Sequence, residues 1–81
     1  MLNYNLDSLQ SAEKLVRLCE KYRDEMELDI DIIYGRQTID GCSLLGVASL
    51  IGKFVTVSTI GRDKEKIKRF EEELERIKNE Q

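Results

Sequence analysis

The segment T-I-D-G-C-S-L-L-G-V-A-S-L-I, residues 38–51, decides between the folds that this chain could adopt. Its start completes a strand, and Asp40 can then cap a helix whose first turn contains Ser43. That helix can extend for only about two turns before Gly52. Unpaired N–H groups and the helix dipole favour an added phosphate on a first-turn hydroxyl. The segment therefore predicts a short helix with a candidate phosphorylation site at Ser43.

Length and composition predict one small domain that spans residues 1–81. A chain of 81 residues has room for a single core and little room for a buried active site. Charged residues make up 36% and hydrophobic residues 41%, which is typical of a soluble globular protein, and no apolar run could cross a bilayer. The N-terminus has no signal-peptide pattern, so we expect a cytoplasmic protein in which Cys19 and Cys42 are reduced thiols.

The charge and the residue counts argue against several functional classes. A net charge of −3, with basic residues mixed among acidic ones, argues against nucleic acid as the partner. The count of zero histidines removes the usual general base, the commonest metal ligand and the usual phosphohistidine carrier. Two cysteines without histidine make a poor metal site. We therefore expect no enzyme activity, no metal and no cofactor, since no nucleophile–base pair can be named.

The first part of the chain predicts an edge strand followed by a helix. Residues 2–6 alternate apolar and polar side chains, which indicates a short strand. Asp7 or Ser8 can cap a helix that runs to about Arg23, with Gln10 or Ser11 completing the cap. One side of this helix is apolar and is formed by Leu9, Ala12, Leu15, Val16, Cys19 and Tyr22.

The rest of the chain predicts three more strands and two helices. From Met26 onward apolar residues alternate with polar ones, which predicts a half-buried strand. The acidic outer face of this strand is expected to be solvated rather than to bind a metal. Tyr34-Gly35-Arg36 is a tight turn that leads to a partner strand at residues 37–39. A β-branched strand at residues 54–60 is expected in the centre of the sheet. Asp63 caps the last helix, whose apolar stripe is Ile67, Phe70, Leu74 and Ile77.

The predicted order is β-α-β-β-α-β-α, which is an α+β fold with helices on one face of a sheet. Two architectures begin in this way. One is the ferredoxin-like plait of small-molecule-sensing ACT domains, with strand order 4-1-3-2 and a full-length second helix. The shortness of the helix after Asp40 favours the other architecture.

Residues 39–50, I-D-G-C-S-L-L-G-V-A-S-L, resemble the regulatory-serine region of HPr, the phosphocarrier of the bacterial sugar phosphotransferase system. The family form is D-A-K-S-I-hydrophobic-G-hydrophobic-hydrophobic-S-L. Asp40, Ser43, Gly46, Ser49 and Leu50 match it. The element order, the Y-G-R hairpin, the V-T-V strand and the charged last helix extend the likeness over almost the whole chain. The resemblance implies an open-faced β-sandwich, with a four-stranded antiparallel sheet of order 1-4-2-3 and three helices on one face.

The region of the carrier histidine departs from the family pattern. HPr has G-L-H-x-R-P at the start of its first helix, whereas this chain has D-S-L-Q-S-A. Ser8 or Gln10 stands nearest the histidine position, and Leu9-Gln10 is similar to the L-Q of the catabolite-repression homologue of HPr, which also lacks that histidine. Neither serine nor glutamine can form the labile phosphoramidate, so the chain cannot act as a histidine phosphocarrier.

The resemblance implies roles for the residues around Ser43. In HPr a dedicated kinase phosphorylates the regulatory serine, and the second helix binds that kinase and a catabolite-control transcription factor. Ser43 is the implied acceptor, and Leu44, Val47 and Ala48 are the implied partner contacts. Cys42 replaces the lysine or similar residue that usually precedes the serine, and the connection at residues 50–53 is shorter than the family loop.

Simpler interpretations stay open for these residues. Ser43, Ser8 and Gln10 can act as capping residues alone. Cys42 is either a redox-sensitive thiol with a lowered pKa or a small residue without a role. The apolar residues after Ser43 can anchor the helix, and those that do not fit inward would leave an exposed patch. The alternative function is an unmodified interaction or small-molecule-sensing domain, and a homodimer is compatible with either function.

Overall fold

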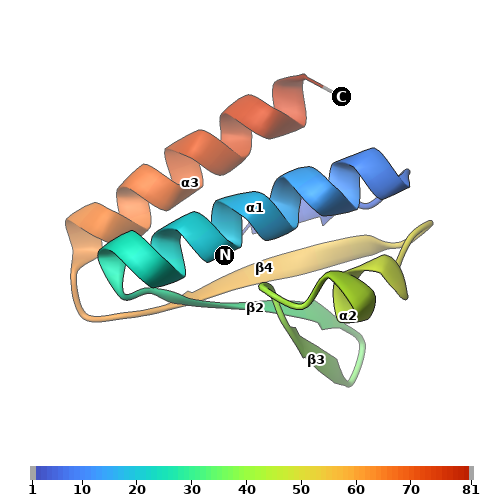
Figure 1. Ribbon diagram of the computed structural model, residues 1–81, viewed down its shortest axis with the longest axis horizontal. Helices are drawn as coiled ribbons and strands as arrows, with labels where there is room; N and C mark the ends of the chain where they lie inside the picture. Colours follow the sequence, from blue (N-terminus) through green and yellow to red (C-terminus); the bar gives the residue numbers. More distant parts are fainter. Residues whose placement is uncertain (1, 81) are drawn as a thin grey trace.

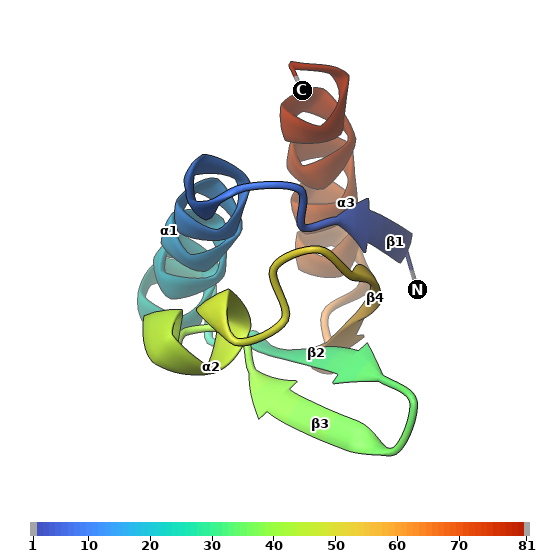
Figure 2. The same cartoon turned by 90° about the vertical axis from the view of Figure 1, so that its right-hand side faces the viewer.

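The chain folds as an antiparallel sheet with helices on one face, in a computed structural model that describes residues 2–80. Figure 1 shows α1 and α3 lying along the sheet, and Figure 2 shows the helices on the same side of it. The elements are β1 (Leu2–Asn5), α1 (Leu9–Met26), β2 (Asp29–Tyr34), β3 (Gln37–Asp40), α2 (Leu44–Ala48), β4 (Phe54–Ile60) and α3 (Lys64–Asn79). The predicted element order is confirmed.

The sheet has the order β1-β4-β2-β3, and all of its neighbouring strands are antiparallel. β4 lies in the interior, where Val55 pairs with Tyr4 of β1 and Val57 pairs with Ile32 of β2. β1 and β3 form the two edges. The expected order 1-4-2-3 is thereby confirmed, and the 4-1-3-2 plait is excluded.

The core lies between the sheet and the helices. Alternation along the strands turns Tyr4, Ile30, Ile32, Val55 and Val57 toward α1 and α3, and these five side chains are buried. α1 and α3 meet in this core, where the rings of Tyr22 and Phe70 pack edge to face with their centroids 5.3 Å apart. The helix faces that close the core contribute Ala12, Leu15, Val16, Leu18, Cys19, Tyr22, Phe70 and Leu74.

The first helix begins where the sequence predicts and ends later. Ser8 is the N-cap, and the Ser8 and Ser11 side chains accept hydrogen bonds from each other's backbone N–H groups. The predicted end near Arg23 is wrong, because α1 continues to Met26. No glycine or proline interrupts the last turn, and Glu27 ends the helix in the left-handed region, at φ 57°. β2 consequently starts only at Asp29.

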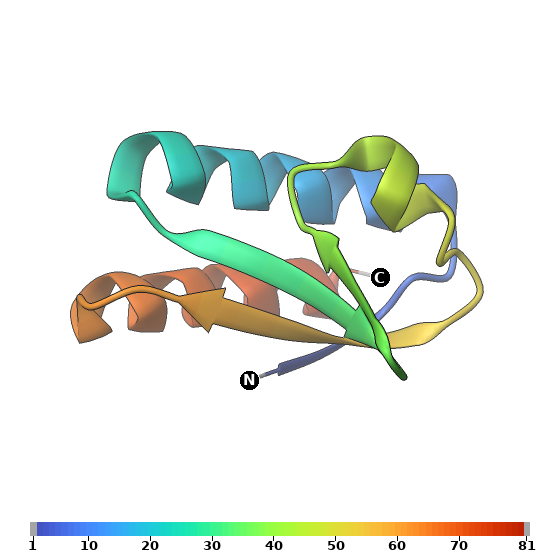
Figure 3. The same ribbon diagram turned by 90° about the horizontal axis from the view of Figure 1, so that it is seen from below.

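The connection from α2 to β4 is tied to the connection from β1 to α1. The Gly52 N–H donates to the Leu6 carbonyl at 2.6 Å, and the Leu6 N–H donates to the Lys53 carbonyl at 3.0 Å. Gly52 has a φ of 94°, a conformation that glycine adopts without strain. Figure 3 shows α2 beside α1 at this end of the molecule. None of the helices within residues 2–80 has the length and apolar character needed to span a bilayer.

Candidate functional site

The turn between β3 and α2 positions Ser43 differently from the sequence expectation. The Asp40 carboxylate accepts a hydrogen bond from the Cys42 N–H at 2.9 Å, and the Asp40 carbonyl accepts one from the Ser43 N–H at 3.0 Å. The N-cap of α2 is Ser43 itself, with extended backbone angles, and its Oγ accepts from the Gly46 N–H at 3.2 Å. The prediction that Asp40 caps α2 is therefore wrong. Its carboxylate closes the preceding turn instead.

The hydroxyl of Ser43 is accessible, although the helix behind it is short. Ser43 is exposed, and α2 has only five residues. Ser43 also precedes the first helical turn rather than lying within it. A helix of this length has a small dipole, and Ser43 Oγ already accepts from one of its unpaired N–H groups. Accessibility is therefore the stronger argument for modification at this position.

Three residues expected to contact a partner have different surroundings. Val47 is completely buried in the core, so its predicted role as a partner contact is wrong. Leu44 is 42% exposed, and Ala48 is half-buried. Leu45 is 88% exposed, the largest fraction among the large hydrophobic residues in the described part of the chain. Leu45 is not among the residues that the resemblance implies as partner contacts.

Helical phase explains this distribution around α2. Val47 and Leu50 are both buried and lie three positions apart, on the same side of the segment. Leu45 lies two positions before Val47, so its side chain points to the opposite side of the helix. Once Val47 is assigned to the core, the exposure of Leu45 follows from the spacing alone.

Glycine allows α2 to pack closely on β3. A Cβ at Gly46 would lie 2.6 Å from Ile39 Cγ2 and 3.1 Å from Ser43 Oγ. Real Cβ atoms do not come so close to a packed side chain, so a larger residue would displace α2 from the sheet or disturb the cap. Gly46 therefore fixes both the position of the helix and the geometry around the Ser43 hydroxyl.

A shallow depression of about 340 Å³ lies between α1 and the start of α2. Cys42 and Leu44 line it from one side, and Arg17 lines it from α1, where it pairs with Glu13 at 3.9 Å. Burial raises the pKa of the Cys42 thiol, which is opposite to the lowered pKa that the redox-sensitive interpretation of Cys42 requires and favours the alternative of a small residue without a role. Burial also raises the pKa of Cys19, which lies in the core as expected.

The degenerate carrier positions lie at the start of α1. Ser8 acts as the N-cap, which confirms its expected capping role. Gln10 takes no part in this cap, because Ser11 completes it. Both positions line a depression of about 240 Å³ together with Lys14 and Glu80, whose charged groups pair at 3.7 Å.

The described residues, 2–80, contain no group of three or more cysteine, aspartate or glutamate side chains placed to hold a metal ion. No protein-family model, curated protein or solved structure matches this chain. Its function must therefore be inferred from its own residues.

Proposed function

We propose that this chain is an HPr-like regulatory module that binds other proteins and is controlled by phosphorylation of Ser43. The observation that carries the proposal is the 88% exposure of Leu45, two positions after an exposed serine hydroxyl. The fold agrees with this function, since the strand order is the one that the resemblance to HPr implies.

The partner-binding surface is the α2 patch, which consists of Ser43, Leu44, Leu45 and Ala48. Leu44 and Leu45 are adjacent and both exposed, while Val47 and Leu50 anchor the segment from beneath. A partner that covers Leu45 would remove a nearly whole leucine side chain from water, which favours binding by roughly 1.5–3 kcal/mol. The partners that the resemblance suggests are an HPr-type serine kinase and a transcriptional regulator.

Phosphorylation would switch this surface through its charge. A phosphate on Ser43 Oγ adds about −1.5 to −2 charge directly beside Leu44 and Leu45. This charge would disfavour a partner that buries the leucines and favour one with a basic side chain at that place. The core does not need to rearrange, because Ser43 is exposed and its neighbours in the cap are local.

The proposed module has no carrier activity and no other catalytic role. Phosphate transfer through a phosphohistidine requires an imidazole, and the chain contains no histidine. The Ser8 hydroxyl at the carrier position caps α1, and Gln10 offers only an amide. We place the module in the cytoplasm, with protein partners rather than nucleic acid or a membrane, and without a cofactor.

Incubation with an HPr-type serine kinase and ATP should add the mass of one phosphoryl group. The Ser43 Oγ would attack the γ-phosphorus of ATP, the bond from that phosphorus to the bridging oxygen would break to release ADP, and the hydroxyl proton would pass to a general base of the kinase. Intact-mass spectrometry measures the gain, which Ser43→Ala should abolish and Ser49→Ala should retain. Ser49 is the matched control because it is also exposed and lies at the other end of α2. The proposed site is wrong if wild type gains no mass or if Ser43→Ala gains as much.

Replacing Leu45 by serine should lower the kcat/KM of that kinase by about tenfold or more, since burying a leucine side chain contributes roughly 1.5–3 kcal/mol and about 1.4 kcal/mol corresponds to a factor of ten. The fold should be unaffected, because the side chain is almost fully exposed. Steady-state kinetics with each variant as the substrate measures the effect. Ile60→Ser is the control, because Ile60 is 54% exposed at the far end of β4. Equal losses for the two variants would contradict docking through the α2 patch.

A further inference from the structure

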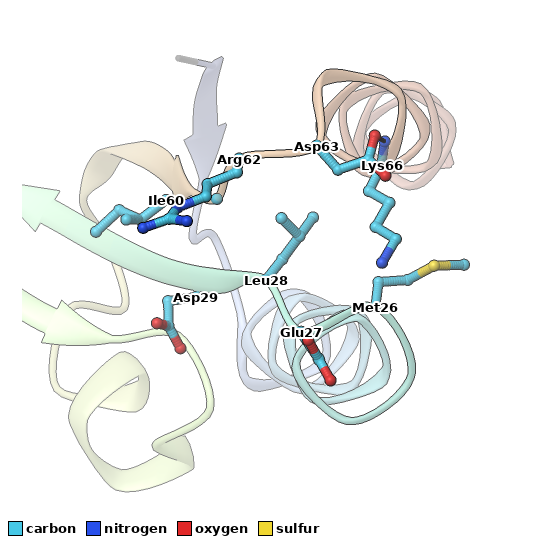
Figure 4. A pocket seen from close by; sticks show the side chains of 9 residues that line it. Met26, Glu27, Leu28, Asp29, Ile60, Arg62, Asp63 and Lys66 are labelled. Carbon is cyan, nitrogen blue, oxygen red and sulfur yellow. Dashed lines mark hydrogen bonds between the residues drawn. The ribbon is translucent and has the colours of Figure 1, made fainter.

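We draw no further inference here: the strongest candidate, the open depression of about 550 Å³ where α1 ends and α3 begins (Figure 4), carries none, because its charged side chains point apart and nothing in the structure shows what covers its apolar floor at Leu28.

Discussion

Replacing Phe70 by alanine should destabilise the fold by about 3–5 kcal/mol. Phe70 is completely buried and packs against the Tyr22 ring at an interplanar angle of 80°. The change would remove most of a phenyl ring from the place where α1 and α3 meet, and the sheet beneath cannot close the gap. Because an 81-residue domain has a total stability of only about 4–12 kcal/mol, a large part of the variant should be unfolded.

Urea denaturation followed by circular dichroism measures this loss. Lys68→Ala is the control two positions away, because an exposed lysine of the same helix should change stability by no more than about 0.5 kcal/mol. Phe70→Leu should retain most of the burial and lose less than Phe70→Ala. A loss below about 1 kcal/mol for Phe70→Ala would contradict the packing of α3 on the core.

Alkaline pH should destabilise the chain in the range from about pH 10 to 12. Burial raises the pKa of both Tyr4 and Tyr22 from 10.0 to about 12, and Glu73 contributes to the shift at Tyr22. The unfolded chain therefore releases these protons at lower pH than the folded chain. The stabilisation is complete below pH 10 and is lost as the pH rises toward 12. For Tyr4, whose hydroxyl donates to the Ser11 carbonyl, the loss should be about 1–2 kcal/mol.

The urea midpoint, measured at a series of pH values, tests this dependence. Tyr22→Phe keeps the ring against Phe70 but has no hydroxyl to ionise, so its stability should fall less between pH 10 and 12. The thiol of Cys19 acts in the same direction, because burial raises its pKa as well. Stability that stays constant up to pH 12 in wild type would show that the two tyrosines are not buried as described.

Local sequence patterns were sufficient for most of the fold. Alternating apolar residues placed the strand at residues 54–60, and its bounds agree with β4. Asp63 was expected to cap the last helix, and its carboxylate does accept two N–H groups of α3. The spacing of apolar residues and the capping of helices depend on residues a few positions apart, so a single sequence is enough to locate strands and helix ends of this kind.

Other features depend on contacts that no local pattern contains. α1 ends at Glu27, which adopts a left-handed conformation unusual for glutamate. The sequence has no glycine at this position that would have indicated the end of the helix. Asp40 and Ser43 are both good caps, and only the turn geometry shows which of them begins α2. Leu28 and Gly61 pack against each other although thirty-three positions separate them in the sequence, because β2 pairs with β4.

The position of β4 between β1 and β2 determines when the chain can fold during its synthesis. β1 has no partner in the sheet until residues 54–57 have been made, although β1 itself is made first. The β2–β3 hairpin can form earlier, but an isolated hairpin is only marginally stable in water. The nascent chain must therefore leave β1 without a partner strand, and Tyr4 without Val55 opposite it, until β4 has been made. Folding can become cooperative only after β4 has left the ribosome and joined the two parts.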